Sequence, residues 1–463
     1  MKISIKNLGA IKQAEFVLGD LTIICGSNNT GKTYATYALF GFLIFWRDVF
    51  SIKIPEADVR QLLNEGSIDL DIQDYIKNAG KILKDGCKAF TEQLPTVFAS
   101  SEKHFSDSEF MVDLELDVVH PDVTFERTMG AAKTQLFSIS KKVGSSVVNI
   151  SLLVEKEKIK IPQDIINRIV GDALKEIIFG RLFPHPFIAS AERTGAAIFR
   201  KELNFARNRI LEQMSSMDKE INPYELLSKV YEDYALPVKT NVDFTRQLEG
   251  LARRDSFIVK QHPELLNDFA NIIGGKYLVT KNDELYYVPH GINTKLTMDE
   301  SSSAVRSLLD IGFYLRHVAN PGDLLMVDEP ELNLHPENQR RMARLFSRLV
   351  NHGIKVFITT HSDYIIKELN TLIMLNHDNP RFRQIAAEEG YQSDELLFAD
   401  KVKVYIAEKA RVKLDGKQQK TLCQTLTAAD IDEKMGIEAR SFDKTIEDMN
   451  RIQEEIVWGE EMS

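Results

Sequence analysis

The amino-acid sequence predicts an α/β fold built around a largely parallel β-sheet with helices packed on it. Near the N-terminus, residues 21–25 (LTIIC) form a continuous apolar run of strand length, typical of a strand buried on both faces. A turn rich in glycine and asparagine leads from this strand into an apolar helix. Further along, helical and strand patterns alternate at residues 302–318, 324–328, 336–350, 355–360 and 363–371. This alternation is typical of parallel strands joined by crossover helices.

The composition is that of a soluble globular protein. The chain has 463 residues, of which 43% are hydrophobic and 27% charged, and its net charge is −10. This balance gives no general attraction to nucleic acid or to an anionic membrane, although a local basic patch stays possible. Cys25, Cys87 and Cys423 are too few for a disulfide framework, and no apolar stretch approaches the ~20 residues that span a membrane. We therefore expect a cytoplasmic protein that does not enter a membrane.

Changes of pattern along the chain predict three domains. The first, residues 1–195, contains a helical insertion at about 55–104 and an antiparallel β subdomain at about 110–160. The second, residues 196–370, begins with helical spacing and ends in the alternating helices and strands. The third, residues 371–463, is expected to be a separate small α/β domain.

The turn after the first buried strand carries a phosphate-binding motif. It fits the pattern G-x-x-x-x-G-K-[ST] at every defined position and lies between a strand and a helix, as the motif requires. Its glycines let successive backbone N–H groups surround a phosphate, helped by the positive end of the helix. We expect Lys32 to neutralise the β- and γ-phosphates of ATP and the Thr33 hydroxyl to ligate Mg²⁺. The predicted nucleotide-binding residues are Gly26, Ser27, Asn28, Asn29, Thr30, Gly31, Lys32 and Thr33.

Two further strands end in polar residues that suit the same site. The apolar strand 324–328 ends at Asp328, which Glu329 follows. We expect Asp328 to be a Mg²⁺ partner and Glu329 to orient or deprotonate the attacking water. The strand 355–360 is followed by His361, and ligands of such sheets bind at the carboxyl ends of the strands. His361 is therefore a predicted catalytic residue, with one ring nitrogen towards the γ-phosphate and the other held by the backbone.

Together these motifs resemble the ABC-type ATPases, including their RecF, SMC and OLD-like branches. Residues 328–336 (DEPELNLHP) match the Walker B strand and D-loop of these proteins, and His361 matches their switch histidine. The resemblance implies an ABC-type fold with a mixed central sheet, an antiparallel β subdomain and a helical lobe. It also implies at least a homodimer, in which one subunit completes the ATP site of another.

The family's signature loop is expected about one helix before the Walker B strand. The serine-rich segment 301–306 (SSSAVR) lies there, so the resemblance implies that Ser302 and Ser303 contact the nucleotide of a neighbouring subunit. The segment lacks the glycine found in the commoner forms of this loop. A serine N-cap of an ordinary helix would also explain it, and the two interpretations are compatible.

A closer resemblance is to ATPases of bacterial antiphage operons. Residues 190–193 (SAER) resemble a segment of OLD-like and antiphage members, where Arg193 would touch phosphate or a neighbouring subunit; an ion pair with Glu192 or another acid fits equally well. The N-terminal lobe, the serine-rich signature and the C-terminal piece look like the ATPase subunit of PARIS systems. That resemblance implies a sensor and scaffold that controls a separate Toprim-type nuclease and responds to a phage-encoded trigger protein.

Two alternatives stay open at this point. An OLD-like enzyme would carry its own nuclease, but the D-x-D at residues 430–432 has polar flanks, and little chain remains after His361 for a Toprim fold. A RecF-like DNA-repair ATPase fits the length, whereas the acidic net charge and the absence of a dense basic stripe argue against it. The best basic cluster consists of Arg200, Lys201, Arg207 and Arg209.

Overall fold

The structure, a computed structural model, describes residues 1–115, 124–131, 134–153, 162–198, 234–282, 284–416, 419–434, 436–437 and 448–456. They divide into two compact units. One unit consists of residues 1–4, 42–93 and 109–184, and the other of residues 5–41, 94–108 and 185–463. This division differs from the predicted boundaries at 195 and 370, because segments that are distant in the sequence contribute to the same sheet.

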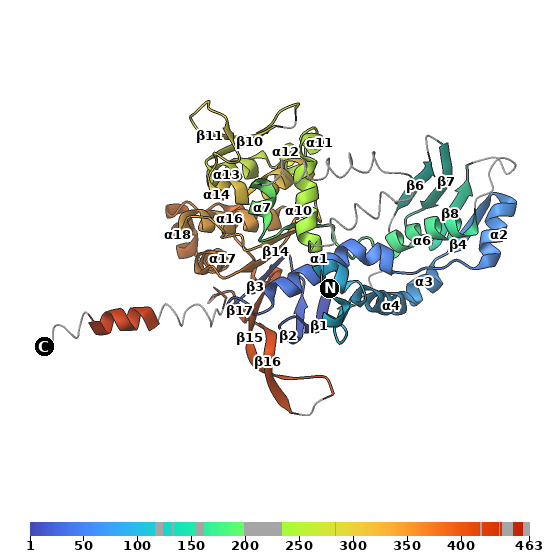
Figure 1. Cartoon of the computed structure of the whole chain (residues 1–463), viewed down its shortest axis with the longest axis horizontal. Helices are drawn as coiled ribbons and strands as arrows, with labels where there is room; N and C mark the ends of the chain where they lie inside the picture. Colours follow the sequence, from blue (N-terminus) through green and yellow to red (C-terminus); the bar gives the residue numbers. More distant parts are fainter. Residues whose placement is uncertain are drawn as a thin grey trace, which may run out of the picture. The chain divides into compact units, whose positions relative to one another are not determined.

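A six-stranded mixed sheet forms the centre of the larger unit (Figure 1). Its strand order is β16-β15-β3-β14-β13-β9. Five of these strands run parallel, and β16 alone pairs antiparallel, with β15. The predicted α/β class with a mixed central sheet is therefore confirmed. In chain order the strands are Leu21–Cys25 (β3), Pro186–Ala189 (β9), Leu324–Asp328 (β13), Lys355–Thr360 (β14), Val402–Lys413 (β15) and Lys420–Ala428 (β16).

The register of the parallel strands brings the three predicted motifs to one edge of the sheet. β3 and β13 are buried at every residue, as their continuous apolar sequences predict. Asp328 at the end of β13 lies opposite Thr359, and Thr360 at the end of β14 lies opposite Cys25. The segments that follow these strands therefore begin side by side.

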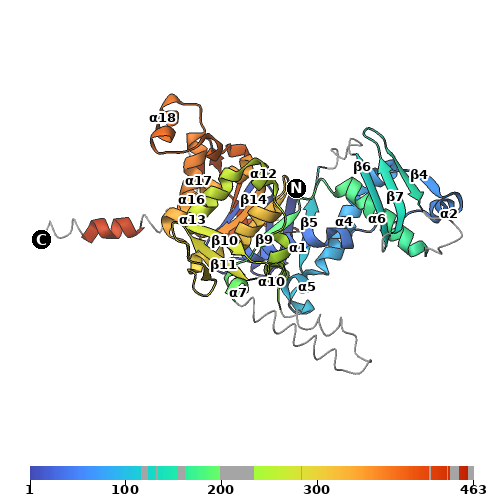
Figure 2. The same ribbon diagram turned by 90° about the horizontal axis from the view of Figure 1, so that it is seen from above.

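Helices pack on this sheet and against one another. The amphipathic helix α16 (Pro336–Asn351) connects β13 to β14 and packs against α17 (Asp363–Leu375) and α13 (Pro263–Ile273), as Figures 1 and 2 show. The helix α1 (Lys32–Val49) follows β3. The predicted single helix 302–318 is instead divided into α14 (Ser303–Ser307), α15 (Leu309–Phe313) and a π-helical turn, η3 (Tyr314–Val318).

The strands of residues 402–428 do not belong to a separate C-terminal domain, in contrast to the prediction. β15 pairs in parallel with β3, directly beside the phosphate loop, and β16 returns along it. The first part of β15 (VKVYIA) is almost entirely buried. Such an apolar strand needs other elements packed on both of its faces. A strand inside the central sheet is covered in this way, whereas a strand of a small independent domain would not be.

The smaller unit contains a four-stranded antiparallel sheet with the order β4-β8-β7-β6. The predicted β subdomain supplies three strands, but β4 comes from the segment expected to be helical. Its sequence, SIDLD, alternates between exposed and buried residues with the period of a strand. The strands are Ser67–Asp71 (β4), Phe125–Ala131 (β6), Thr134–Lys141 (β7) and Val147–Leu152 (β8); the helices of this unit are Glu56–Glu65 (α2), Gln73–Lys77 (α3), Ala79–Thr91 (α4) and Gln163–Phe179 (α6).

The other described elements include two separate three-stranded sheets and a pair of short strands. They are Lys2–Leu8 (β1), Ile11–Val17 (β2), Leu94–Phe98 (α5), Glu102–His104 (η1), Glu109–Asp113 (β5), Arg193–Ile198 (α7), Leu236–Arg246 (α10), Leu248–Leu251 (α11), Phe257–Gln261 (α12), Gly275–Val279 (β10), Leu285–Pro289 (β11), Leu296–Thr297 (β12), Pro380–Glu388 (α18), Ser393–Glu395 (η4), Ala399–Lys401 (η5), Ile431–Asp432 (β17) and Gly436–Ile437 (β18).

Two sequence predictions concern features outside these elements. The basic cluster Arg200, Lys201, Arg207 and Arg209 lies outside the described residues. Across the part of the chain that is described, the helices are too short or too polar to cross a membrane.

Candidate functional site

The phosphate loop between β3 and α1 adopts a backbone path that requires its two glycines. Gly26 has a φ of +133° and Gly31 a φ of +99°, values that residues with side chains rarely adopt. A Cβ atom on Gly26 would lie 2.6 Å from the carbonyl oxygen of Ala407 in β15, and one on Gly31 would lie 2.6 Å from Cγ1 of Ile11 in β2. The neighbouring strands therefore hold the loop close and leave no room for side chains at these positions.

Lys32 turns its ammonium group back into this loop. Its Nζ donates hydrogen bonds to the carbonyl oxygens of Gly26, at 2.9 Å, and Ser27, at 2.8 Å. The side chain is only 6% exposed. Burial lowers the pKa of Lys32, whereas the negative charges of Glu329 and Asp328 raise it. A buried cation is thus held at the predicted phosphate-binding loop, with uncharged carbonyl groups as its partners.

Asp328 joins two motifs at the edge of the sheet. One of its carboxylate oxygens, Oδ1, accepts a hydrogen bond from the hydroxyl of Thr359, and Oδ2 accepts one from the hydroxyl of Thr33 at 3.5 Å. The pKa of Asp328 is raised to about 6, mainly by burial. The hydrogen bond from Thr359 opposes this rise, and the negative charge of Glu329 adds to it. Because a carboxylate and a hydroxyl are the oxygen ligands that Mg²⁺ prefers, the pair Thr33 and Asp328 fits the predicted metal site.

Glu329 has an uncommon backbone conformation, with a φ of +50°. A non-glycine residue in this left-handed region is strained by ~1 kcal/mol or more, and such strain is concentrated at functional sites. The backbone N–H of Glu329 donates to the carbonyl oxygen of Thr359, at 3.1 Å, and to its hydroxyl, at 3.2 Å. These contacts with β14 hold the turn that follows β13, and so fix where the Glu329 side chain begins.

The ring of His361 lies between two carboxylates, which differs from the predicted contact with the backbone. Nδ1 is 3.6 Å from Oε1 of Glu329, and Nε2 is 3.7 Å from Oε1 of Glu331. The backbone N–H of His361 donates to the same oxygen of Glu331 at 2.8 Å. Within the described residues, Nδ1 of His361 and Oε2 of Glu331 are buried without a hydrogen bond. Buried polar atoms are normally satisfied, so these two are suited to a bound ligand or water.

Arg193 is a buried hydrogen-bonding hub next to the turn that carries Asp328 and Glu329. Its side chain donates to four backbone carbonyl oxygens: Ser190 at 2.8 Å, Asp328 at 2.6 Å, Glu329 at 2.9 Å and Ser307 at 2.6 Å. The residue is 1% exposed. It therefore connects the turn after β13 to the end of α14 and has no room to reach solvent or another subunit in this conformation. The predicted ion pair with Glu192 is not formed; that carboxylate accepts a hydrogen bond from the hydroxyl of Tyr37 at 2.9 Å.

A second buried acid lies on α15 near this hub. Asp310 is 1% exposed, and within the described residues neither of its carboxylate oxygens has a hydrogen-bond partner. Burial raises the pKa of Asp310 to about 7, and the positive charge of Arg193 lowers it. Without that cation an isolated buried carboxylate would be more costly still.

The serine-rich segment forms the capped start of α14. The Ser302 hydroxyl accepts a hydrogen bond from the backbone N–H of Val305 at 3.3 Å, which is the predicted N-cap. Ser302 and Ser303 are both exposed. Arg306 supports the segment from behind by donating to the carbonyl oxygens of Ser301 and Met298 at 2.6 and 3.1 Å. No hydrogen bond among the described residues joins either serine to the phosphate loop of the same chain.

Comparison with known families decides the class of protein. Residues 1–366 match the family described as AAA ATPase domain. The chain belongs to this ATPase family. A search of curated proteins gave no match.

Solved structures similar to this ATPase include three SMC head domains. One is the SMC head bound to the C-terminal winged-helix domain of ScpA, with 12% identity, a TM-score of 0.33, and 94% of this chain and 98% of that chain covered. The SMC head domain from Thermotoga maritima has 11% identity, a TM-score of 0.28 and coverage of 93% and 98%. An SMC head with an extended coiled coil, bound to the C-terminal domain of ScpA from Pyrococcus furiosus, has 12% identity, a TM-score of 0.29 and coverage of 98% for both chains.

Three residues beside the predicted site residues were missed by the sequence analysis. Glu331 lies in the same segment as Asp328 and Glu329. Three acids among the four residues 328–331 (DEPE) were a signal that the sequence analysis could have used. Thr359 hydrogen-bonds both Asp328 and the N–H of Glu329. It is one residue before the end of a buried strand, and a polar side chain at such a position is itself a signal. The sequence gave no signal for Tyr37, because an aromatic residue in an apolar helix is expected to be part of the hydrophobic core.

Proposed function

We propose that this ATPase binds ATP and Mg²⁺ at the carboxyl edge of its central sheet and hydrolyses ATP as a conformational switch. In this proposal the loop 26–33 holds the phosphates, with Lys32 as the neutralising cation. Thr33 and Asp328 hold the magnesium ion, which would offset phosphate charge. Glu329 accepts a proton from the attacking water, and His361 approaches the γ-phosphate from β14. The support is the contact of Thr33 and Thr359 with one carboxylate, since it brings residues from three distant motifs to one point.

We further propose that the complete site is shared between two copies of the chain. The supporting observation is the exposed, capped start of α14, whose serines make no hydrogen bond to their own phosphate loop in the described structure. Such a segment is available to cap the nucleotide of a partner. Arg193 holds the far end of α14 and the turn after β13 together, so a partner that moves α14 would also move Glu329.

A mixing experiment tests the shared site. Ser302→Glu with Ser303→Glu should abolish ATP hydrolysis through repulsion from the phosphates, while each isolated chain still binds ATP. Lys32→Ala should also be inactive. A mixture of the two should regain activity, because one of the two sites in each mixed dimer combines an intact loop with intact serines. Absence of recovery at every mixing ratio, with dimers demonstrated by light scattering, would contradict a shared site.

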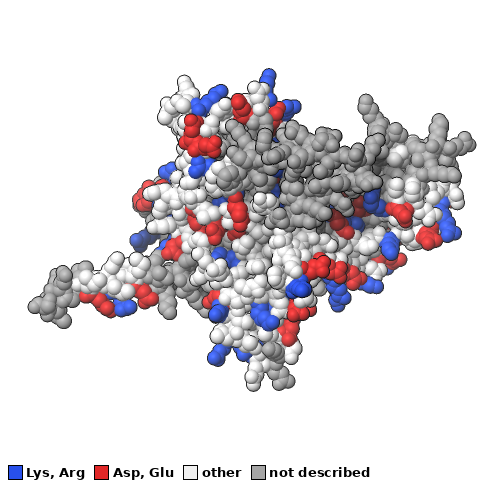
Figure 3. Space-filling model, in the orientation of Figure 1, with Lys and Arg blue, Asp and Glu red and all other residues white. Residues whose placement is uncertain are grey.

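The biological role that we propose is a sensor and scaffold subunit of an antiphage defence system, in which ATP controls a separate effector such as a Toprim-type nuclease. Its support is the sequence resemblance to PARIS-type ATPases. Asp430 and Asp432 are exposed and, among the described residues, do not belong to any three-residue group with metal-ligand spacing. On the face drawn in Figure 3, basic and acidic side chains are interspersed over the described surface without a continuous basic stripe, which favours a protein partner over DNA.

The test of this role separates it from the two alternatives. The purified chain should hydrolyse ATP but cut neither plasmid DNA nor tRNA in Mg²⁺ or Mn²⁺. Cleavage or toxicity should require co-expression with the product of a neighbouring gene. Cleavage by the single chain that disappears on replacing Asp430 and Asp432 with asparagine would favour an OLD-like nuclease. ATP-dependent binding of the single chain to duplex DNA would favour a RecF-like repair ATPase.

A further inference from the structure

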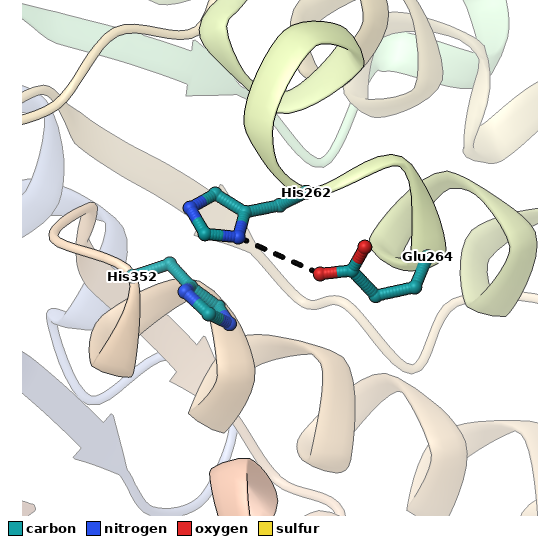
Figure 4. Close-up of side chains that lie close together, drawn as sticks. All are labelled: His262, Glu264 and His352. Carbon is teal, nitrogen blue, oxygen red and sulfur yellow. Dashed lines mark ion pairs between the residues drawn. The ribbon is translucent and has the colours of Figure 1, made fainter.

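Two histidines and a glutamate of the larger unit lie close together (Figure 4). His262 is the residue before α13, Glu264 is in the first turn of that helix, and His352 follows the last residue of α16. Because His352 is three residues before β14, it lies near the amino end of a strand whose carboxyl end carries His361. The cluster and the ATP site are therefore at opposite ends of the same strand.

We propose that His262, Glu264 and His352 form a binding site for a zinc-type transition-metal dication. One ligand atom of each residue lies within 4.8 Å of those of the other two. Nδ1 of His262 is 3.5 Å from Oε1 of Glu264. Two ligands of a tetrahedral zinc ion, each at about 2.0–2.2 Å, are about 3.3–3.5 Å apart, so this pair already has the spacing of co-ligands.

The surroundings of His352 also resemble those of a metal ligand. Its Nε2 lies 3.3 Å from Oδ2 of Asp394, and Arg348 donates to the same carboxylate oxygen at 2.8 Å. Metal-bound histidines generally use their second nitrogen in this way, because a carboxylate partner fixes the ring and raises its basicity. Asp394 would thus orient His352, leaving Nδ1 for the metal. Two imidazoles with one carboxylate favour zinc over Mg²⁺ or Ca²⁺, which select sites made of oxygen ligands.

Access and rigidity support the site. The side chains of His262, Glu264 and His352 are 25%, 47% and 20% exposed, so an ion can enter and one coordination position stays open to water. The ligands come from two helices that pack against each other, and Asn338 of α16 donates to the carbonyl oxygen of Ile272 in α13 at 3.1 Å. A metal would join the start of α13 to the end of α16, the helix that follows the Asp328–Glu329 turn.

The test is metal binding to chelator-treated, nucleotide-free protein, measured with Zn²⁺ by calorimetry and with Co²⁺ by visible absorption. We expect one saturable site that His262→Ala and His352→Ala each weaken by at least about tenfold. His290→Ala, at an exposed histidine outside the cluster, and His361→Ala, at the ATP site, should leave this binding intact. Glu264→Gln, which keeps the shape of the side chain, should weaken binding without affecting the fold.

Several outcomes would overturn the proposal. They are the absence of saturable Zn²⁺ binding, equal binding by the parent and by Glu264→Gln and His352→Ala, or loss of the site only in His361→Ala. If His262→Ala does not fold, the other two cluster variants decide the question. A Co²⁺ spectrum without the strong visible bands of a tetrahedral ion would exclude the proposed geometry. In that case the two rings, whose centroids are 3.9 Å apart and whose planes are tilted by 37°, are only a packed pair between Glu264 and Asp394.

Discussion

Arg193 donates a hydrogen bond from Nη1 to the backbone carbonyl oxygen of Asp328 at 2.6 Å, across 135 residues of sequence. The contact holds the backbone of Asp328, the proposed Mg²⁺ ligand, at the end of β13. The same guanidinium reaches Glu329 and Ser307, so the acid turn and the end of α14 share one support.

Arg193→Met should therefore reduce ATP turnover by at least about tenfold and destabilise the fold. The methionine occupies similar space but removes the guanidinium donors from four buried carbonyl groups, of which those of Ser190 and Glu329 keep a backbone N–H donor, at a cost on the order of 3 kcal/mol. Single-turnover hydrolysis and thermal unfolding measure the two effects. Arg253→Met is the matched control, because the exposed side chain of Arg253 forms an ion pair with Glu249 at the surface. Parent-like turnover in a folded Arg193→Met protein would show that the hub does not position the acids.

Lys32→Ala should weaken ATP binding by about 100-fold, or about 3 kcal/mol, because the loop loses its buried cation against several phosphate charges. Binding of a fluorescent ATP analogue measures the change. Lys12→Ala, which removes an exposed lysine bonded to Asn7, should bind like the parent. An unchanged affinity in Lys32→Ala would contradict the assignment of the phosphate loop.

Glu329→Gln should retain binding of ATP and Mg²⁺ but lower the hydrolysis rate by about 10²–10⁴-fold, or ~3–5 kcal/mol of barrier. The amide keeps the size of the side chain but cannot accept a proton from water. Phosphate release under saturating ATP measures the rate, with Glu337→Gln at the start of α16 as the control. Hydrolysis at the parent rate would remove Glu329 from the role of general base.

Asp310→Asn should stabilise the protein more at high pH than at low pH. Because the pKa of Asp310 is raised to about 7 by burial, the folded chain retains a proton that the unfolded chain releases at about pH 4. The stability associated with this proton is present in acid and is lost as the pH rises through 7. Above that pH the parent carries an ionised buried carboxylate and the asparagine variant does not.

Thermal unfolding at pH 5 and pH 8.5 measures this difference. We expect the gain in Tm to be larger at pH 8.5 by on the order of 5 °C. Asp378→Asn removes an equal charge from an exposed ion pair with Arg383 and controls for net charge. A gain that is the same at both pH values would mean that Asp310 does not titrate as its burial requires.

Local pattern was sufficient to predict the elements that carry the proposed ATP site. The phosphate loop, the strand ending in Asp328 and the strand ending in His361 are each defined by residue type and spacing over fewer than ten positions, and β13 and β14 begin and end where the sequence predicts. Such motifs can be recognised in the sequence because a phosphate-binding loop needs glycine at fixed positions, and because a strand buried on both faces must be apolar throughout.

Tertiary structure alone decided which distant segments support that site. Nothing in the sequence around Arg193 indicates that its guanidinium has four carbonyl partners. Every residue has a backbone carbonyl that can accept a hydrogen bond, so the sequence does not show which carbonyls lie near the guanidinium. The placement of β15 beside β3 could not be predicted from the sequence either. An apolar sequence indicates that a strand is buried, but the neighbours of the strand depend on pairing between segments that are almost the whole chain apart. The sequence by itself therefore determined which residues are proposed to meet the nucleotide, and only the packing of remote elements decided what holds those residues in place.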